Sequence, residues 1–210
     1  MTSLASVTLQ VDDTTAADRF YSAAFGLGGP HLLLRPSEAP TSGFRGFTLS
    51  LTVSQPADVD AFVGAAVEAG ATTLKPASKS LWGYGGVVRA PDGTIWKVAT
   101  SAKKNSGPAT RDIDALVLLL GVEDVKASKQ FYVGQGLLVG KSFGGKYVEF
   151  DAGTGPLKLA LYKRAALAKD AGVPADGAGA HRIVLGGTAG SFTDPDGFAW
   201  EAASLARTGE

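Results

Sequence analysis

Cysteine is absent from this sequence, and histidine occurs only twice. Without cysteine the chain has no disulfide, no thiolate metal ligand and no cysteine nucleophile. With only two histidines, no Ser-His-Asp set can be assembled, and no paired-carboxylate set emerges either. The sequence therefore excludes thiol chemistry and offers no support for a hydrolytic triad.

Net charge is also absent, because 20 acidic residues balance 20 basic ones. A neutral chain offers no electrostatic reason to bind nucleic acid or an anionic membrane surface. The longest apolar run, Ala115 to Gly121, is too short to cross a bilayer, and no basic segment followed by an apolar one opens the chain. We therefore expect a cytoplasmic protein, monomeric or homodimeric, with no membrane or nucleic-acid partner.

What the sequence does contain is an internal repeat. The stretch Asp12–Tyr21 returns as Glu123–Tyr132, each an acidic pair followed by a stretch that ends in Phe-Tyr. Ala90–Lys97 returns as Asp194–Glu201, each with Pro-Asp-Gly and then Trp. Two landmarks in the same order, in a chain that is 45% hydrophobic, predict two domains of about a hundred residues each.

A polar stretch with glycine and proline separates the two copies. We place the first domain at residues 1–103, the linker at 104–111 and the second domain at 112–210. Residues 56–70 of the first copy form a helix pattern for which the second copy has no room between His181 and Ser191. The first copy in turn lacks room for a strand pair, because Thr48 follows Phe20 by 28 positions whereas His181 follows Phe131 by 50. Each copy is thus shortened where the other is complete, which predicts two domains that pack against each other.

Periodicity and capping residues predict a mixture of helices and strands. An acidic cap opens the first helix, which Gly26 ends, and residues 75–86 are expected to be a loop. The other expected helices cover residues 56–70, 125–133 and 165–171. The expected strands cover residues 7–11, 31–35, 47–53, 87–89, 95–100, 113–122, 138–143, 146–150, 157–162 and 182–185, with a last hairpin at 191–203.

These landmarks have a recognisable order along nearly the whole chain. The strand, acidic pair and Phe-Tyr helix come first, then Ala69-Gly70-Ala71 with Lys75-Pro76 after it, then Trp82 to Gly86 and the closing Trp-Lys-Val-Ala. In this order the sequence resembles the vicinal oxygen chelate superfamily, which includes glyoxalase I, bleomycin-resistance proteins, fosfomycin-resistance enzymes and extradiol dioxygenases. The resemblance implies an α+β fold: tandem glyoxalase-like domains of paired βαβββ units, whose curled mixed sheets form a cavity.

Metal-using members of this superfamily resemble one another in a set of ligands: a His on the first strand, a His on the fifth and a Glu on the last. In the first copy the resemblance places Ser6, Thr48 and Lys97 at these positions. A Ser-Thr-Lys set does not hold a divalent ion, because the ammonium group repels it. We expect the first copy to bind no metal.

The second copy carries Val117, His181 and Glu201 at the same positions. Val117 has no ligand atom, so His181 and Glu201 are weak metal candidates. The alternative is that His181 is a strand-edge histidine with satisfied hydrogen bonds and that Glu201 pairs with a nearby cation. We expect no cofactor.

In the first copy, strand alternation predicts one polar row that runs from Ser6 to Gln10 and another that runs from Thr48 to Thr52, with Lys97 on the closing strand. Such rows suit a cavity for a small polar ligand, although they would equally suit a face that meets solvent. Arg45 and two loop aromatics join the candidates, with loop packing as the alternative. The candidate ligand-binding residues are Ser6, Gln10, Arg45, Thr48, Ser50, Trp82, Tyr84 and Lys97.

Three functions remain open from the sequence. The leading hypothesis is a glyoxalase- or bleomycin-resistance-like protein that binds a small organic molecule in a metal-free cavity. The rival is a metal-dependent lyase, isomerase or dioxygenase that uses His181 and Glu201. The third is a partner-binding module whose cavities are vestigial. The residues name no ligand and leave open whether any reaction is catalysed.

Overall fold

The structure is a computed structural model that describes residues 2–153, 155 and 157–203. It combines three β-sheets with helices that lie mostly outside them, so the expected α+β class is confirmed. The helices are α1 (Thr14–Phe25), α2 (Pro56–Glu68), α3 (Val125–Gly134) and α4 (Arg164–Ala171).

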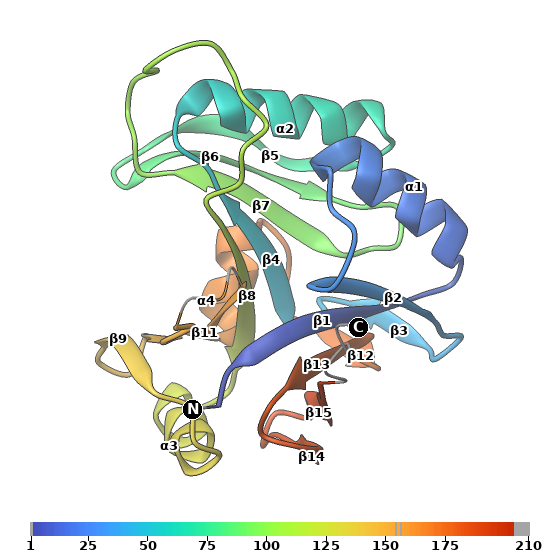
Figure 1. Cartoon of the computed structure of the whole chain (residues 1–210), viewed down its shortest axis with the longest axis vertical. Helices are drawn as coiled ribbons and strands as arrows, with labels where there is room; N and C mark the ends of the chain where they lie inside the picture. The colour runs from blue at the N-terminus through green and yellow to red at the C-terminus, as the bar shows by residue number, and fades with distance from the viewer. Residues whose placement is uncertain (1, 154, 156, 204–210) are drawn as a thin grey trace, which may run out of the picture.

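The largest sheet has eight strands and curls into an open C (Figure 1). Strand β4 runs antiparallel to β8 at its centre, so the two halves of the chain meet there. Its strands, in spatial order, are β5 (Thr72–Ser80), β6 (Gly83–Arg89), β7 (Ile95–Thr100), β4 (Phe47–Thr52), β8 (Ala115–Val122), β11 (Leu157–Lys163), β10 (Tyr147–Phe150) and β9 (Val139–Phe143).

The second sheet has five strands and again mixes both halves of the chain. Strand β1 runs antiparallel to β13 and parallel to β2. In spatial order its strands are β14 (Phe192–Thr193), β15 (Ala199–Ala202), β13 (Ile183–Gly187), β1 (Leu4–Val11) and β2 (Leu32–Pro36). A two-stranded ribbon pairs β3 (Thr41–Gly43) with β12 (Gly177–Gly179).

Each large sheet therefore takes strands from both halves of the chain. The connection between β7 and β8 is also held in place: the Gln55 side-chain oxygen accepts hydrogen bonds from the backbone of Ser106 and Gly107, and Asp58 accepts one from Thr110 at 2.6 Å. The proposed boundary at residues 104–111 stays a prediction.

One apolar core joins the inner faces of both sheets to α1, α2 and α3. Trp96 and Leu118 of the eight-stranded sheet and Leu185 of the five-stranded sheet are all fully buried in it. A separate, smaller cluster lies on the opposite face of the eight-stranded sheet, beneath α4. The main burial of apolar surface, and with it most of the stability, therefore lies between the sheets and the first three helices.

An aspartate caps the helix that follows the acidic pair in each half of the chain; the cap of the first helix was predicted. Asp13 accepts hydrogen bonds from the backbone N–H groups of Thr15 and Ala16 at the start of α1. Asp124 does the same at the start of α3. Gly26 adopts the left-handed conformation, φ 63°, at the end of α1.

The expected loop at residues 75–86 is wrong, because this stretch contributes to β5 and β6. Its Lys, Pro, Ser and Gly residues carry little strand propensity, and β5 is an edge strand whose only neighbour is β6. The ribbon of β3 and β12 was also missed, since three-residue strands rich in glycine show no alternation.

The described part of the chain has no helix between His181 and Ser191, as the spacing predicted. No helix within the described residues is both long and apolar enough to span a bilayer.

Candidate functional site

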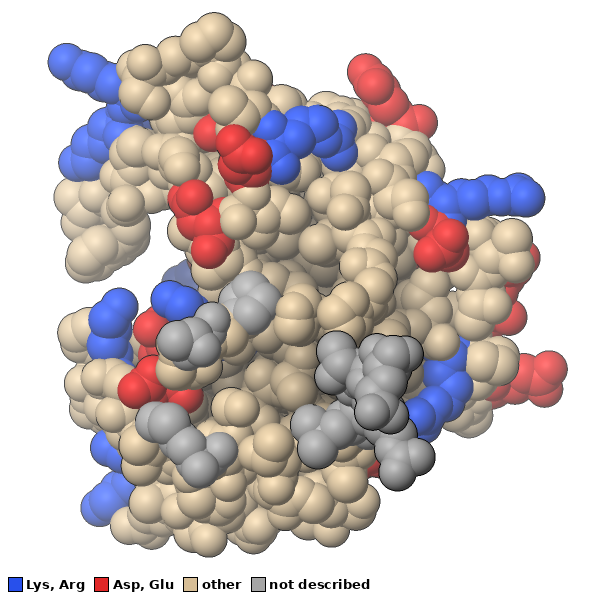
Figure 2. All heavy atoms as spheres, viewed as in Figure 1, with Lys and Arg blue, Asp and Glu red and all other residues tan. Residues whose placement is uncertain are grey.

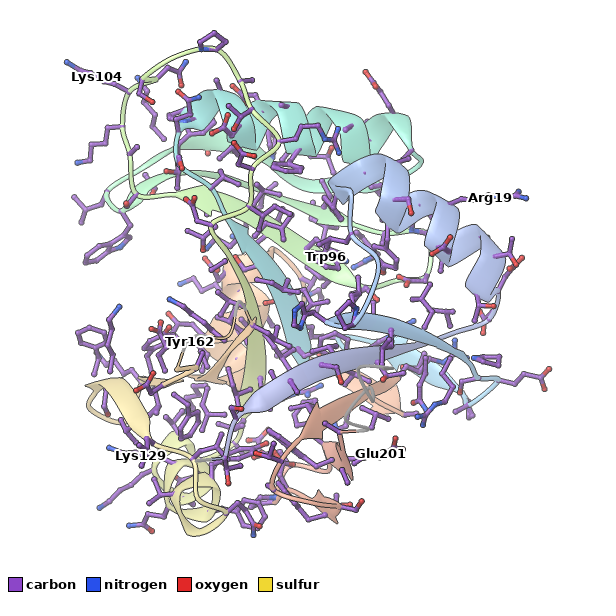
Figure 3. The ribbon with its side chains drawn as sticks, viewed as in Figure 1. Arg19, Trp96, Lys104, Lys129, Tyr162 and Glu201 are labelled. Carbon is purple, nitrogen blue, oxygen red and sulfur yellow. The ribbon has the colours of Figure 1, made fainter. Side chains whose placement is uncertain are left out.

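The concave face of the eight-stranded sheet, called the hollow below, carries a row of side chains. Strand pairing places them next to one another. Lys97 on β7 pairs with Ser50 on β4, and Ser50 pairs with Val117 on β8. Directly paired residues point to the same face of a sheet, so these three positions share the hollow side. Tyr162 of β11 lies on this side as well (Figure 3).

Helix α4 lies behind β4 and β8 in Figure 1 and packs against this face of the sheet. Its residues Leu167, Ala168 and Ala171 pack against Val87 and Ile95 of the sheet. Thr48 and Ser50, which the sequence proposed as ligand contacts, are only 4% and 8% exposed there. The helix thus covers the middle of the hollow, and a cavity remains beside each of its ends.

A cavity of about 320 Å³ lies at the outer end of the hollow, beside the end of α4. Gly85 and Ala99, paired across β6 and β7, line it with almost no side chain. Figure 2 shows the molecule hollowed on its left side, where the β5–β6 hairpin stands above β9. The residues that line the cavity are Lys75, Pro76, Ser78, Ser80, Trp82, Gly83, Tyr84, Gly85, Val87, Lys97, Ala99, Thr100 and Asp170.

The two predicted aromatic contacts of this cavity differ in their placement. Trp82 sits in the β5–β6 turn and is 84% exposed, so its indole is free to cover a ligand. Tyr84 instead donates its hydroxyl hydrogen bond to Asp60 of α2 at 2.8 Å, and this bond raises the pKa of the tyrosine. Because α2 packs on the other face of the sheet, we take Trp82 as the aromatic available to a ligand.

Charged groups also line the cavity. The Lys97 ammonium contacts the Asp170 carboxylate at 2.7 Å, an ion pair in which both side chains remain partly exposed. The Lys75 ammonium donates to the backbone oxygens of Lys169 and Asp170, at 2.8 and 2.7 Å. Lys75 and Asp170 were not predicted from the sequence as lining residues, because no local pattern predicts that α4 contacts β5 and β7.

Ser6 and Gln10 lie outside this cavity, on β1 of the five-stranded sheet. Ser6 pairs with Gly186 of β13, which in turn pairs with Glu201 of β15. Glu201 lies at the protein surface (Figure 3) and accepts two hydrogen bonds from Arg35, at 2.8 and 2.9 Å. These bonds lower the pKa of Glu201 and raise that of Arg35.

His181 has both ring nitrogens next to backbone oxygens. Nδ1 lies 2.6 Å from the oxygen of Arg45, and Nε2 lies 3.1 Å from that of Asp196. The ring also stacks on Phe198, with centroids 4.0 Å apart. His181 and Glu201 therefore have separate partners, the arrangement that the sequence offered as the alternative to a metal site.

The donor sets in neither sheet fit a catalytic metal ion. The hollow of the eight-stranded sheet offers Thr48, Lys97 and Val117, of which one is a cation and one has no ligand atom. Among the described residues no three His, Cys, Asp or Glu side chains come together. The groups present therefore do not support the metal ion that the resemblance implied.

Arg45 belongs to a second, larger cavity of about 680 Å³ that also borders His181. Its guanidinium donates to the backbone oxygen of Asp92 at 2.6 Å, and burial lowers its pKa. The candidate ligand set from the sequence is thus divided: Trp82, Tyr84 and Lys97 line one cavity, Thr48 and Ser50 lie beneath α4, Arg45 lines another cavity, and Ser6 and Gln10 lie on the second sheet.

Comparison with known proteins finds no matching family model and no matching curated sequence. Solved structures do match. Glyoxalase I from Zea mays is 15% identical with a TM-score of 0.62, over 95% of this chain and 91% of its own. A Bacillus subtilis protein provisionally named a dioxygenase is 12% identical with a TM-score of 0.54, over 88% and 69%. The chain therefore has the fold of glyoxalase I, as the resemblance implied.

Proposed function

We propose that the chain binds a small, flat organic molecule in the cavity at the outer end of the eight-stranded sheet, without a metal ion. The observation that carries the proposal is a floor without large side chains, formed by Gly85 and Ala99, between an exposed Trp82 and the ammonium of Lys97. A cavity wall without large side chains leaves room for an aromatic ring of the ligand. The Trp82 indole can stack on that ring, and the Lys97 ammonium can donate a hydrogen bond to a polar group at the edge of the ring.

The chemistry of the donors supports binding over metal catalysis. Lys97 stands in the row where a metal ligand would be needed, and its positive charge opposes a cation there. We place this binding in the cytoplasm, in a monomer or homodimer and without nucleic-acid or membrane partners. Bleomycin-resistance-like sequestration remains the form of the activity that we favour over a reaction.

The test is a thermal-shift screen of aromatic small molecules, followed by calorimetric titration of the hits. A molecule that binds only the folded state must raise the melting temperature. Trp82→Ala should weaken hits at least about tenfold, because stacking is lost. Ala99→Leu should fill the floor and abolish binding.

Tyr84→Phe is the matched control, since the Tyr84 hydroxyl is engaged by Asp60 on the other face of the sheet. Its affinities should stay within about twofold of the parent. Titrations repeated after chelator treatment should give unchanged affinities, and untagged protein should hold well under one metal ion per chain. Affinities that are unchanged in Trp82→Ala and Ala99→Leu would contradict the proposed site. Affinities that are lost after chelator treatment would favour the metal-dependent enzyme.

A further inference from the structure

The cavity already contains one carboxylate, and it belongs to the chain itself. Asp170, near the end of α4, places Oδ2 2.7 Å from the ammonium of Lys97. Among the described residues, Lys97 has no other acidic partner. Lys75 and Lys97 line the cavity with Asp170 as the one acidic side chain in the lining. The cavity therefore presents two cations to any occupant.

The two ends of α4 are held differently. At its start, the Arg164 guanidinium donates to the backbone oxygen of Phe44 at 2.7 Å and lies over the Phe44 ring. At its end, the helix is held by the Lys75 bonds to its last carbonyl groups and by the ion pair of Asp170. Gly172 then ends the helix in the left-handed conformation, φ 78°. The end of the helix thus combines the buried contacts of Ala168 and Ala171 with charged contacts that border the cavity.

The apolar contacts of α4 are limited. The cluster that Leu167, Ala168 and Ala171 form with the sheet is separate from the main core. A local opening of the helix end would leave the main core packed, and segments with few apolar contacts open at low free energy. The end of α4 is therefore the part of this cavity wall that can move without unfolding the chain.

We infer that the ligand of this cavity carries a carboxylate, which replaces the Asp170 carboxylate on Lys97 and releases the end of α4. This inference rests on the proposed function and names its ligand class. Two carboxylates cannot both keep a short contact with one ammonium without repelling each other. Asp170 thus competes with the ligand carboxylate for Lys97. The end of α4 is the lid of the cavity, and the ion pair holds this lid closed.

The lid is tested without any ligand, by amide hydrogen exchange at residues 168–173. Asp170→Asn keeps the size of the side chain and removes its charge, so these amides should exchange about threefold to tenfold faster than in the parent. Asp176→Asn is the control, because Asp176 is exposed and its carboxylate has no ion-pair partner among the described residues. Equal exchange in Asp170→Asn and the parent would overturn the lid.

The ligand class is tested by titrating benzoate and its neutral analogue benzamide. Asp170→Asn should bind benzoate about threefold to tenfold more tightly than the parent, because the competitor is gone. The double variant Asp170→Asn, Lys97→Met should lose this gain, and benzamide should not distinguish the variants. Equal benzoate affinity in parent and Asp170→Asn, or no benzoate binding to either, would overturn the inference. If neutral compounds still bind in that case, and their affinity still falls in Trp82→Ala, the proposed function stands without this inference.

Discussion

The two large sheets cover their polar faces in different ways. The eight-stranded sheet buries part of its hollow under α4, through Leu167 and its neighbours, and keeps a cavity beyond the helix. The five-stranded sheet has the Arg35–Glu201 ion pair, which joins β2 to β15 across β1 and β13. Buried apolar contacts stabilise more than an exposed ion pair does, so the eight-stranded sheet should depend more on α4 than the five-stranded sheet depends on Arg35 and Glu201.

A second contrast lies in the repeated tyrosine, one in each half of the chain. Tyr21 donates to Asp92 at 2.6 Å, and the indole N–H of Trp96 is buried with no partner among the described residues. Tyr132 donates to Asp194 at 2.7 Å and also accepts a hydrogen bond from Trp200 at 3.3 Å. The same residue types therefore form a two-bond chain in one copy and a single bond in the other.

The largest effect is expected from a substitution in the apolar contacts of α4 with the eight-stranded sheet. Leu167→Ala should lower the free energy of unfolding of α4 by about 2 kcal/mol, because it removes a buried leucine from a small cluster. The loss should appear as faster exchange at residues 168–173, with a smaller change in global denaturation. Leu185→Ala, in the main core, should instead lower global stability by about 3 kcal/mol. Equal effects of both variants on global unfolding would show that α4 is part of the main core.

The next effect separates the two tyrosines. Tyr132→Phe should cost about 2 kcal/mol, because it leaves both the Asp194 oxygen and the Trp200 N–H without this partner. Tyr21→Phe should cost about 1 kcal/mol, since only the bond to Asp92 is lost. Urea denaturation measures both. A larger loss for Tyr21→Phe would contradict the comparison.

The third effect concerns pH. Burial raises the pKa of Asp194 in the folded protein above its ordinary value, despite the hydrogen bonds it accepts. The folded state therefore holds the Asp194 proton more tightly than the unfolded chain does, and ionisation of this group destabilises the fold as pH rises. Asp194→Asn cannot ionise. In paired urea titrations, the free energy of unfolding of the parent should fall relative to this variant as pH rises from the unfolded pKa of Asp194 to its raised folded pKa, and the difference should then level off. A constant difference would rule out the effect.

The smallest effect tests the ion-pair cover. Glu201→Gln should lower stability by no more than about 1 kcal/mol at neutral pH, because both partners are nearly half exposed. The lowered pKa of Glu201 means that the stabilisation is present above its unfolded pKa and is lost as pH falls through the folded one. Added salt should shrink the difference.

Ligand affinity and metal content should stay unchanged in Glu201→Gln and in His181→Ala. Loss of a bound ion in both variants would restore the metal hypothesis.

The sequence by itself determined the features that depend on near neighbours. The Asp13 and Asp124 caps, the helices after Pro56 and Val125, and the missing helix after His181 follow from residues a few positions apart. A helix cap or a helical period is set within one or two turns, so it can be read locally.

Only the tertiary structure decided how the two copies combine. The pairing of β4 with β8 and of β1 with β13 joins residues far apart in the chain, and it separates Ser6 from Thr48 and Lys97. The contact of Lys97 with Asp170 spans 73 positions and depends on α4 packing against the hollow of the sheet. Sequence patterns carry side-chain type and local period, whereas the partners of a strand or helix are selected by the burial of whole faces, which only the assembled fold defines.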